Sequence, residues 1–468
     1  MKRFYAIMVL LMVLLKASAA DVNRLVGGDL SLVPAYEQAG DQWLDESGKA
    51  IPDLIQYVQA KGWNAVRVRV FVDPSKDSDP AVCQDLKYAV ALAKRVKAAG
   101  MAVLIDLHYS DTWADPSNQK IPAAWTDHST EGLTTQVGNY TREVMTALVE
   151  AGAAPDYVQL GNEITYGMLW NTADGKFPAD KGQYASAGYC PTWSNRFSDG
   201  QQQWHRLAAF LSAGSKAVRE LVPGAKIVIH TDMPADANHL LNFHNHIRTA
   251  GFTDYDVIGL SYYPFWSGKL DNLGAALSKL KTAFPTTKVQ VVETAWYNSY
   301  YPYAEDGDGQ YALSSLPASW TADAKGMVSY LSDLTDRLKL YDNVDGLYYW
   351  QPEECGNGYQ KKVLNKWSNR GMWPSLNQRQ HSILRTPDGR TPVDALARYV
   401  KEVLPIDPTG VEKMRNGENE KMRNGENEKM RNFVFDLMGR RISHSLIFST
   451  SHSPYKGVYI RNGRKVVK

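Results

Sequence analysis

Two glutamates stand where a buried strand is expected to end. Glu163 closes the apolar run VQLGNE and Glu293 closes the run VQVVE. A carboxylate directly after a buried strand is costly unless it is paired, hydrogen-bonded or needed for chemistry. Glycoside hydrolysis uses two carboxyl groups that flank one bond, about 5–5.5 Å apart for retention and about 6.5–9.5 Å apart for inversion. The alternative is a pair of structural carboxylates, each bound to a buried arginine.

Further polar and aromatic residues follow apolar runs of the same kind. Arg67 and Arg69 are two residues apart, so they share one face of a strand. The chain has 26 Tyr and 13 Trp against 12 Phe, and the polar-edged rings of Tyr and Trp suit sugars as well as protein cores. With the two arginines, the candidate substrate-binding residues are Asn162, His108, Asp111, Trp113, His230, Tyr262, Trp296 and Trp350.

Several of these candidates have a second interpretation. His108 and His230 either line a cleft or form part of a hydrogen-bonded wall. The tryptophans either stack on sugar rings or fill the core. Asp111 either reaches substrate or caps the loop TWADP together with Asp115.

Eight apolar, β-branched runs alternate with amphipathic stretches between residues 25 and 350. One of these stretches is DLKYAVALAKRVKAAG, a helix pattern that ends at Gly100. This alternation predicts an α/β fold, a (β/α)8 TIM barrel with long βα loops, in which the C-terminal ends of the strands form one rim. A doubly wound open sheet is the competitor, although no GxGxxG or GxxxxGK[ST] motif opens the first unit. The eight runs lie around residues 25–30, 65–72, 101–107, 157–160, 226–230, 256–260, 289–292 and 346–350.

Seven motifs in one chain order carry a family resemblance between Leu25 and Trp373. They are VRVRVFVDP, DLHYSDTWADP, LGNEITYGMLW, HTD, LSYYPFW, VVETAWYN and GLYYWQPE. Together they resemble glycoside hydrolase family 53, the arabinogalactan endo-β-1,4-galactanases, in the clan of barrel enzymes with glutamates on strands four and seven. The resemblance implies a retaining mechanism, with Glu163 as general acid/base and Glu293 as nucleophile.

The chemistry of these roles predicts the surroundings of each glutamate. Glu163 must hold a proton until it reaches the leaving oxygen, which requires apolar walls and a neighbouring negative charge to raise its pKa. Glu293 must be ionised, so we expect Arg69 or Arg67 and the Tyr262 hydroxyl beside it. A donor for the sugar 2-hydroxyl is expected from Asn162.

No cofactor is expected for the chemistry, but a structural calcium ion is considered. Asp306 and Asp308 lie in the loop EDGDG, whose carboxylates and carbonyls suit a hard cation. The resemblance implies such a site in bacterial members, followed by His and Asn ligands. Here the sequence QYA departs from that pattern, and a solvated acidic turn is the alternative. Of the three cysteines, Cys190 and Cys355 are candidates for a disulfide, and three free thiols are the other possibility.

The two ends differ from the middle of the chain. Residues 1–20 have the layout of a cleaved signal peptide, with an uncleaved anchor as the alternative. The catalytic domain is expected over residues 21–404. The EKMRNGEN repeats in residues 405–432 indicate a flexible linker, or else a charged single helix. Residues 433–468 are expected to form a short β-rich tail that resembles bacterial sorting signals.

The leader predicts an exported protein. The resemblance implies an endo-acting retaining hydrolase of β-1,4-galactosidic bonds in galactan and type I arabinogalactan, the side chains of pectin. The alternatives are a hydrolase of mannan or xylan and a non-catalytic carbohydrate-binding surface protein. A net charge of +2 argues against a nucleic-acid partner. We expect no stable membrane span after signal cleavage, a monomer, and a location outside the cell, in the periplasm or on the outer surface of a bacterium.

Overall fold

The computed structural model describes the chain from residue 24 to residue 401 with gaps, and four short strands beyond it. The described ranges are 24–116, 118–170, 200–232, 234, 236–298, 317–354, 370–374 and 385–401. The chain divides into two compact units, Met1–Glu402 and Val403–Lys468. Several predictions fall outside the described residues, namely the leader, the linker, the cysteines Cys190 and Cys355, and the acidic residues Asp306 and Asp308.

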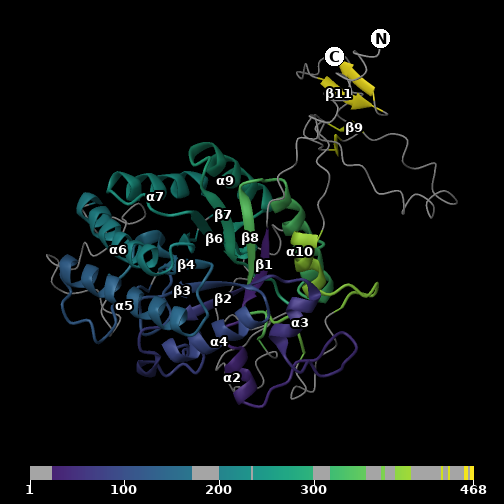
Figure 1. The fold of residues 1–468 in the computed structure, drawn as a ribbon. Coiled ribbons are helices and arrows are strands. Elements are labelled where there is room, and N and C mark those ends of the chain that lie inside the picture. The colour runs from purple at the N-terminus through teal and green to yellow at the C-terminus, as the bar shows by residue number, and fades with distance from the viewer. Residues whose placement is uncertain are drawn as a thin grey trace, which may run out of the picture. The chain divides into compact units, whose positions relative to one another are not determined.

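Eight parallel strands close into a barrel in the first unit (Figure 1). Each strand pairs with the next along the chain, and β8 pairs with β1, with Asp29 opposite Trp350. The closed ring confirms the predicted (β/α)8 barrel and excludes the open sheet. Its strands are β1 (Leu25–Asp29), β2 (Ala65–Val70), β3 (Ala102–Leu107), β4 (Tyr157–Leu160), β5 (Lys226–Thr231), β6 (Val257–Ser261), β7 (Lys288–Glu293) and β8 (Val344–Trp350).

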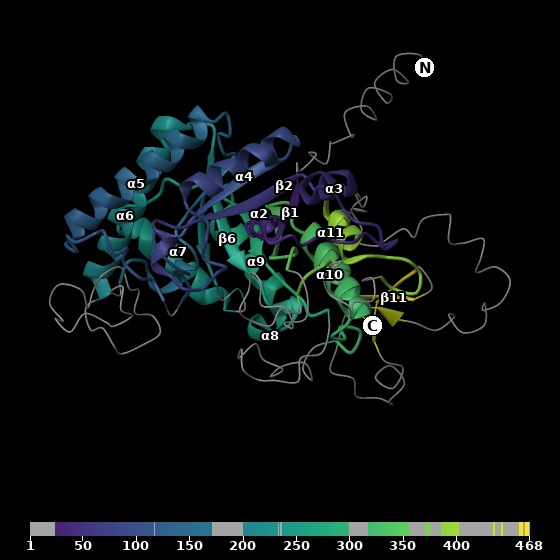
Figure 2. The ribbon, with the colours of Figure 1, turned by 90° about the horizontal axis from the view of Figure 1, so that it is seen from below.

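Helices surround the outside of the barrel, as the two views at right angles show (Figures 1 and 2). In the chain they lie between successive strands, except α11, which follows β8. The described helices are α2 (Val33–Gln38), α3 (Leu54–Lys61), α4 (Leu86–Ala98), α5 (Thr130–Glu150), α6 (Gly200–Leu221), α7 (Ala237–Thr249), α8 (Pro264–Ser267), α9 (Leu270–Ala283), α10 (Ala324–Lys339) and α11 (Pro392–Lys401).

Helix α4 illustrates how the sequence sets these elements. The Asp85 carboxylate caps its first turn by accepting the backbone N–H of Tyr88. The buried residues recur every three or four positions, so one stripe faces the barrel. Gly100 follows the helix with φ +75°, a conformation that costs glycine little. The helix predicted from this segment is confirmed.

The barrel interior changes from apolar to polar along the strands. An inner apolar cluster fills its lower part, and it consists of Leu25, Ala65, Leu104, Val228, Val257, Val292 and Tyr348. On β2 the two-residue period of a strand places Arg67 and then Arg69 above Ala65, on the same inward face. Both arginines are fully buried. The upper layer of the interior is therefore made of charged and polar side chains.

The second unit contains a four-stranded sheet in the order β10-β9-β11-β12. The neighbouring strands are antiparallel, and β11 and β12 pair with Arg461 opposite Arg464. The strands are β9 (Val434–Phe435), β10 (Arg441–Ile442), β11 (Val458–Arg461) and β12 (Arg464–Val467). The β-rich character of the tail agrees with the alternating pattern of its sequence. Its sorting role stays a prediction.

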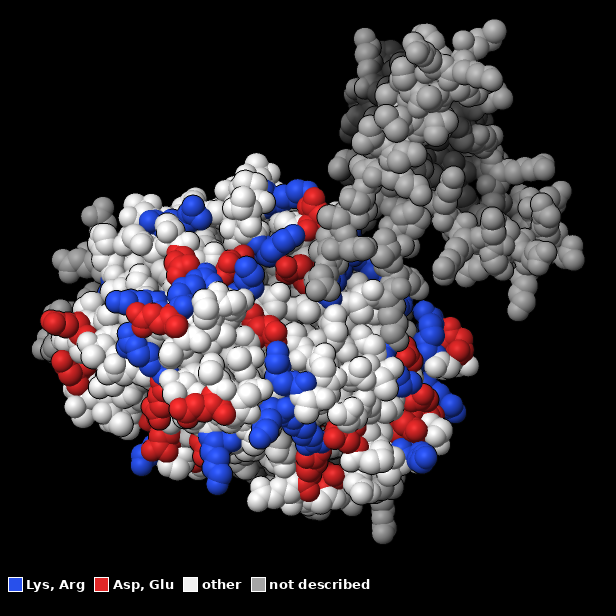
Figure 3. Space-filling model, viewed as in Figure 1, with Lys and Arg blue, Asp and Glu red and all other residues white. Residues whose placement is uncertain are grey.

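The surface of the first unit is mixed in charge. On the face drawn in Figure 3, the Lys and Arg side chains are interspersed with Asp and Glu side chains. Many of them pair across neighbouring elements, as when Arg95 on α4 binds both Glu37 and Asp53. No helix in the described part of the chain is both long and apolar enough to span a bilayer.

Candidate active site

A cavity of about 240 Å³ lies at the C-terminal end of the barrel, between the two glutamates. Glu163 follows β4 and Glu293 ends β7, so the cavity brings together side chains that are 130 positions apart in the chain. Residues at the C-terminal ends of four strands, β3, β4, β6 and β8, complete its wall. The cavity is lined by Trp113, Ala114, Asp115, Asn162, Glu163, Tyr263, Phe265, Trp266, Glu293, Trp350 and Arg370.

A tight turn after β4 aims Glu163 at this cavity. Gly161 has φ +80°, and a Cβ atom there would lie 2.7 Å from Ile164 Cγ2. Glu163 itself adopts the left-handed conformation, with φ 46° and ψ 51°. Such a conformation costs a non-glycine residue about 1–3 kcal/mol and is found where the surroundings impose it. Here the Glu163 N–H donates to His230 Nδ1 at 3.2 Å, which holds the turn in place.

A bulge in β7 sets the direction of Glu293. Leu260 pairs with Val291, whereas the next residue of β6, Ser261, pairs with Glu293. Val292 is therefore the extra residue of β7, and it packs in the inner apolar cluster. Bulges of this kind often redirect a side chain next to an active site. This one turns Glu293 into the cavity.

The charges around Glu293 favour its ionised form. Arg67 Nη2 lies 3.0 Å from Glu293 Oε1, and the Tyr263 hydroxyl donates to Glu293 Oε2 at 2.9 Å. Burial raises the pKa of Glu293 to about 7, with Arg67 and Tyr263 opposing that rise. Of the two arginines considered in the sequence, Arg67 is the one beside this carboxylate.

The prediction for Tyr262 is wrong, and its neighbour Tyr263 has that position. The Tyr262 hydroxyl donates to the carbonyl of Gly268 at 2.8 Å, and its ring is fully buried in the outer core. Strand β6 faces inward at Val257 and Ser261, so the two-residue period continues to Tyr263. The alternation in the sequence was a sufficient signal for the correct choice.

Glu163 has a different electrostatic environment. Burial raises its pKa well above the ordinary value, and the neighbouring charges of Glu293 and Asp232 raise it further. The nearby Ser261 hydroxyl opposes that rise in the pKa. Because Arg67 and the Tyr263 hydroxyl contact the Glu293 carboxyl directly, Glu293 loses its proton before Glu163 does. The pair thus holds one ionised and one protonated carboxyl, as the two expected roles require.

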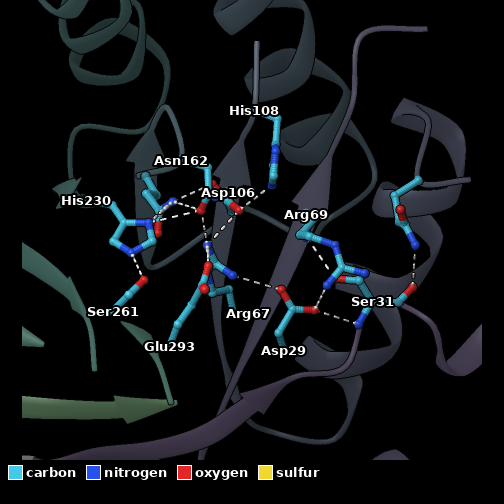
Figure 4. A network of polar contacts seen from close by, with 12 residues as sticks. Asp29, Ser31, Arg67, Arg69, Asp106, His108, Asn162, His230, Ser261 and Glu293 are labelled. Atoms are coloured by element: carbon cyan, nitrogen blue, oxygen red, sulfur yellow. Dashed lines mark hydrogen bonds and ion pairs between the residues drawn. The ribbon is translucent and has the colours of Figure 1, made fainter. Parts of the chain in front are cut away.

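A buried charge network holds the Arg67 side chain that contacts Glu293 (Figure 4). Arg67 Nη1 donates to Asp29 at 3.0 Å and Nη2 donates to Asp106 at 2.8 Å, while Arg69 Nη1 donates to the other Asp29 oxygen at 2.7 Å. All four side chains are fully buried. Arg67 and Arg69 therefore hold other side chains in place rather than contacting substrate directly, which corrects the expectation from their sequence position.

The two histidines also belong to the wall beneath the cavity. The Ala114 N–H donates to His108 Nδ1 at 3.1 Å, and His108 Nε2 lies 3.0 Å from Asp106 Oδ2. His230 is fully buried under Glu163. Neither ring lines the cavity. Of the two interpretations left open by the sequence, the hydrogen-bonded wall is the one that the structure supports.

The aromatic candidates divide between the cavity and the core. Trp113 and Trp350 line the cavity, and the Arg69 guanidinium lies 4.7 and 4.8 Å from their ring centres. Trp296 is fully buried against Trp320 and Tyr330, so it cannot stack on a sugar.

Asp111 does not line the cavity either. Its carboxylate accepts the backbone N–H groups of Asp73 and Ala123, so it caps neighbouring loops. Asn162 does line the cavity, where its Oδ1 accepts from Arg67 at 2.7 Å and its Nδ2 donates to the Ala114 carbonyl at 2.8 Å.

The structure adds cavity residues that the sequence analysis did not select. Besides Tyr263, they include Asp115, Phe265, Trp266 and Arg370. Trp266 is 61% exposed although it is large and apolar, which distinguishes it from a core residue. Its position as the last residue of the motif LSYYPFW was the available signal. No sequence signal indicated Arg370, because it lies 20 residues after the end of β8.

This fold and site define a class of protein. A closed eight-stranded barrel that carries two carboxyls of unlike surroundings, Glu293 buried and Glu163 partly exposed, in a cavity at its C-terminal rim is an architecture of glycoside hydrolases. The model described as "Glycosyl hydrolase family 53" matches residues 25–385. The chain belongs to this family, and it is a glycoside hydrolase.

Relatives and solved structures agree with this assignment. A probable arabinogalactan endo-beta-1,4-galactanase A of Aspergillus fumigatus is 33% identical over 378 residues, which cover 77% of this chain and 94% of the relative. The GH53 catalytic domain of Ignisphaera aggregans superposes with a TM-score of 0.65 at 26% identity, covering 82% of this chain and 98% of that one. A structure from a study of two fungal beta-1,4-galactanases gives a TM-score of 0.61 at 28% identity, with 80% and 99% covered.

Proposed function

We propose that this enzyme cleaves internal β-1,4-galactosidic bonds of galactan and type I arabinogalactan by double displacement. The observation that carries the proposal is the unlike pair in one cavity. Glu293 lies beside Arg67 and Tyr263, whereas burial and the carboxyls of Glu293 and Asp232 raise the pKa of Glu163. Family membership and the galactanase names of the relatives support the choice of substrate.

In the first step Glu163 donates its proton to the glycosidic oxygen while a Glu293 oxygen attacks the anomeric carbon. The bond between that carbon and the leaving oxygen breaks, and a covalent glycosyl ester forms on Glu293. Arg67 and Tyr263 hold the Glu293 carboxylate in one orientation before the attack, since each contacts a different oxygen.

In the second step Glu163, now ionised, removes a proton from water as that water attacks the same anomeric carbon. The ester bond breaks, and Glu293 is released as a carboxylate beside Arg67 and Tyr263. Because each step inverts the anomeric carbon, the product retains the configuration of the substrate. The regenerated proton on Glu163 prepares the next cycle.

Asn162 is placed to orient the sugar. Its amide is held at both ends by Arg67 and by the Ala114 carbonyl, so its direction is set before substrate binds. The amide nitrogen has a second hydrogen, which we assign to the sugar 2-hydroxyl. That contact strengthens as positive charge develops on the sugar ring in the transition state.

Parallel digestions test the substrate. Purified full-length protein is incubated with β-1,4-galactan, mannan and xylan, and released reducing ends are measured. We expect release from galactan and none from Glu293→Gln. Release from mannan or xylan alone would overturn the substrate, and binding of galactan without any release would favour a non-catalytic carbohydrate-binding protein.

Four further expectations stay predictions. Export through the leader is tested by sequencing the N-terminus of the secreted protein, and the location by fractionation of the cells that produce it. Calcium at Asp306 and Asp308 is tested by metal analysis of the purified protein after dialysis against chelator. The monomer is tested by light scattering.

A further inference from the structure

Beyond the proposed function, on which this inference rests, a buried cation lies against two aromatic rings of the cavity wall. The Arg69 guanidinium carbon lies 4.7 Å from the ring centre of Trp113 and 4.8 Å from that of Trp350. The two indoles are themselves 5.9 Å apart, with 64° between their planes. We propose that Arg69 is a positioning residue that sets the angle between Trp113 and Trp350, and thereby the fit of the cavity to the apolar face of a galactose ring.

The burial of the three side chains places the cation on the protein side of the rings. Arg69 is fully buried, whereas Trp113 and Trp350 are partly exposed and line the cavity. Substrate can therefore reach the indoles but not the guanidinium. Figure 4 shows the Arg69 guanidinium turned toward Asp29, to which its Nη1 atom donates at 2.7 Å. This fully buried ion pair holds the cation in one place beside the rings.

Two further nitrogen atoms of Arg69 are left to interact with the rings. A guanidinium carries five N–H donors, and among the described residues the Nε and Nη2 atoms of Arg69 have no hydrogen-bond partner. Buried donors without a partner cost free energy, and the electron-rich faces of the indoles attract the cation in place of an acceptor oxygen. A rotation that takes either ring away from the cation loses this attraction. Arg69 therefore opposes rotation of both rings.

Other contacts hold each ring separately. The Trp113 Nε1–H donates to Asp79 Oδ2 at 3.2 Å, so this ring is held at its edge as well as on its face. The Trp350 ring also lies 5.6 Å from the guanidinium carbon of Arg67. Because Arg69 contacts both rings, a change in the orientation of one is felt by the other. Arg69 thus couples the two indoles into one surface of the cavity.

The consequence concerns the binding of substrate rather than the breaking of the bond. The axial 4-oxygen of galactose leaves the opposite face of the sugar ring apolar, and an indole packs against such a face. Two indoles at a fixed angle accept the ring in one orientation. Because this contact is the same in the bound substrate and in the transition state, its loss raises KM and leaves kcat nearly unchanged.

The test is Arg69→Lys in the full-length enzyme, with Arg24→Lys as a matched control. Lysine keeps the charge beside Asp29, but its compact ammonium lacks the planar group that lies against two rings. The Arg24 guanidinium lies 5.6 Å from the ring centre of Tyr399, directly before β1 and so at the opposite end of the barrel from the cavity. On galactan we expect Arg69→Lys to raise KM roughly 3- to 10-fold, with kcat within about 2-fold of the wild type. Arg24→Lys should leave both unchanged.

A measurement without substrate separates this inference from a wrong substrate. Closely packed indoles give coupled bands in far-ultraviolet circular dichroism, and the difference between the wild type and Trp113→Phe isolates the bands that depend on Trp113. We expect Arg69→Lys to weaken these bands and Arg24→Lys to retain them. If the wild type does not cleave galactan, the proposed substrate is wrong, and these spectra alone decide whether Arg69 sets the angle between the rings.

A second variant and two contrary results keep the outcome decisive. If Arg69→Lys does not fold, Arg69→Met replaces it, because methionine fills the space without a charge, and a larger loss of the bands is expected. A folded variant with the wild-type KM or the wild-type bands overturns the proposal. A fall in kcat at an unchanged KM also overturns it, since Arg69 then acts through Asp29 and Arg67 on the nucleophile rather than through the indoles.

Discussion

The adjacent tyrosines Tyr262 and Tyr263 allow the site to be tested with one atom removed at a time. Each substitution to phenylalanine removes one hydroxyl and keeps the ring. The Tyr263 hydroxyl donates to Glu293 Oε2 at 2.9 Å, whereas the Tyr262 hydroxyl donates to the Gly268 carbonyl at 2.8 Å. The two variants therefore differ in whether the lost hydrogen bond reached the nucleophile.

The magnitude follows from the charge on the acceptor. A hydrogen bond to a charged group is worth about 1.5–3 kcal/mol, and about 1.4 kcal/mol corresponds to one pKa unit or a factor of ten. We therefore expect Tyr263→Phe to raise the pKa of Glu293, which is about 7 in the wild type, by about one to two units. Glu293 must be ionised to attack, so the acid limb of the pH–rate profile should move to higher pH.

The assay is the pH dependence of kcat/KM on galactan for the wild type and both variants. Tyr263→Phe should lose more activity at low pH than at high pH, since rising pH restores the Glu293 carboxylate. Tyr262→Phe should keep the wild-type acid limb. The reasoning is refuted if the acid limb of Tyr263→Phe coincides with that of the wild type, or if both variants shift equally.

Three other substitutions test the supports and the rim of the site. Arg67→Met leaves Asp29, Asp106 and Glu293 buried without their shared cation, so urea titration should show a loss of about 3–5 kcal/mol in the free energy of unfolding; an unchanged midpoint contradicts this. Gly161→Ala places a Cβ atom on a residue with positive φ and close to Ile164. The same titration should show a loss of about 1–3 kcal/mol in the free energy of unfolding, and an unchanged value would mean that the turn relaxes without strain. Trp266→Ala should leave the melting temperature unchanged because the ring is exposed, but raise KM for galactan roughly 2- to 10-fold if the ring stacks on sugar; an unchanged KM excludes that contact.

The barrel and the two glutamates were accessible from the sequence because their signals are local. Apolar runs alternating with amphipathic helices specify the (β/α)8 order, and in a closed ring of parallel strands every strand end lies on the same rim. Glu163 and Glu293 stand at the ends of such runs. The order of the strands was therefore enough to predict that both line one cavity. The same reasoning predicted that Trp113, Trp350 and Asn162 lie near the cavity, and all three line it.

The direction and surroundings of side chains were decided by the tertiary structure. Strand alternation separates Tyr263 from Tyr262, but on β7 the extra residue Val292 interrupts the alternation, and only pairing with Ser261 shows where Glu293 points. A bulge depends on the neighbouring strand, so a single run of sequence does not specify it.

Distances across the barrel likewise decided which charged residues line the cavity and which hold other side chains in place. Chain order placed Arg67, Arg69, His108 and His230 near the rim, and their complete or nearly complete burial makes them supports for other side chains. The sequence by itself determined which residues gather at the C-terminal end of the barrel, because strand order and polarity are local properties. Apart from the choice of Tyr263 over Tyr262, which strand alternation indicates, the tertiary structure decided which of them face the cavity, because burial and ion pairing arise only when the eight strands close.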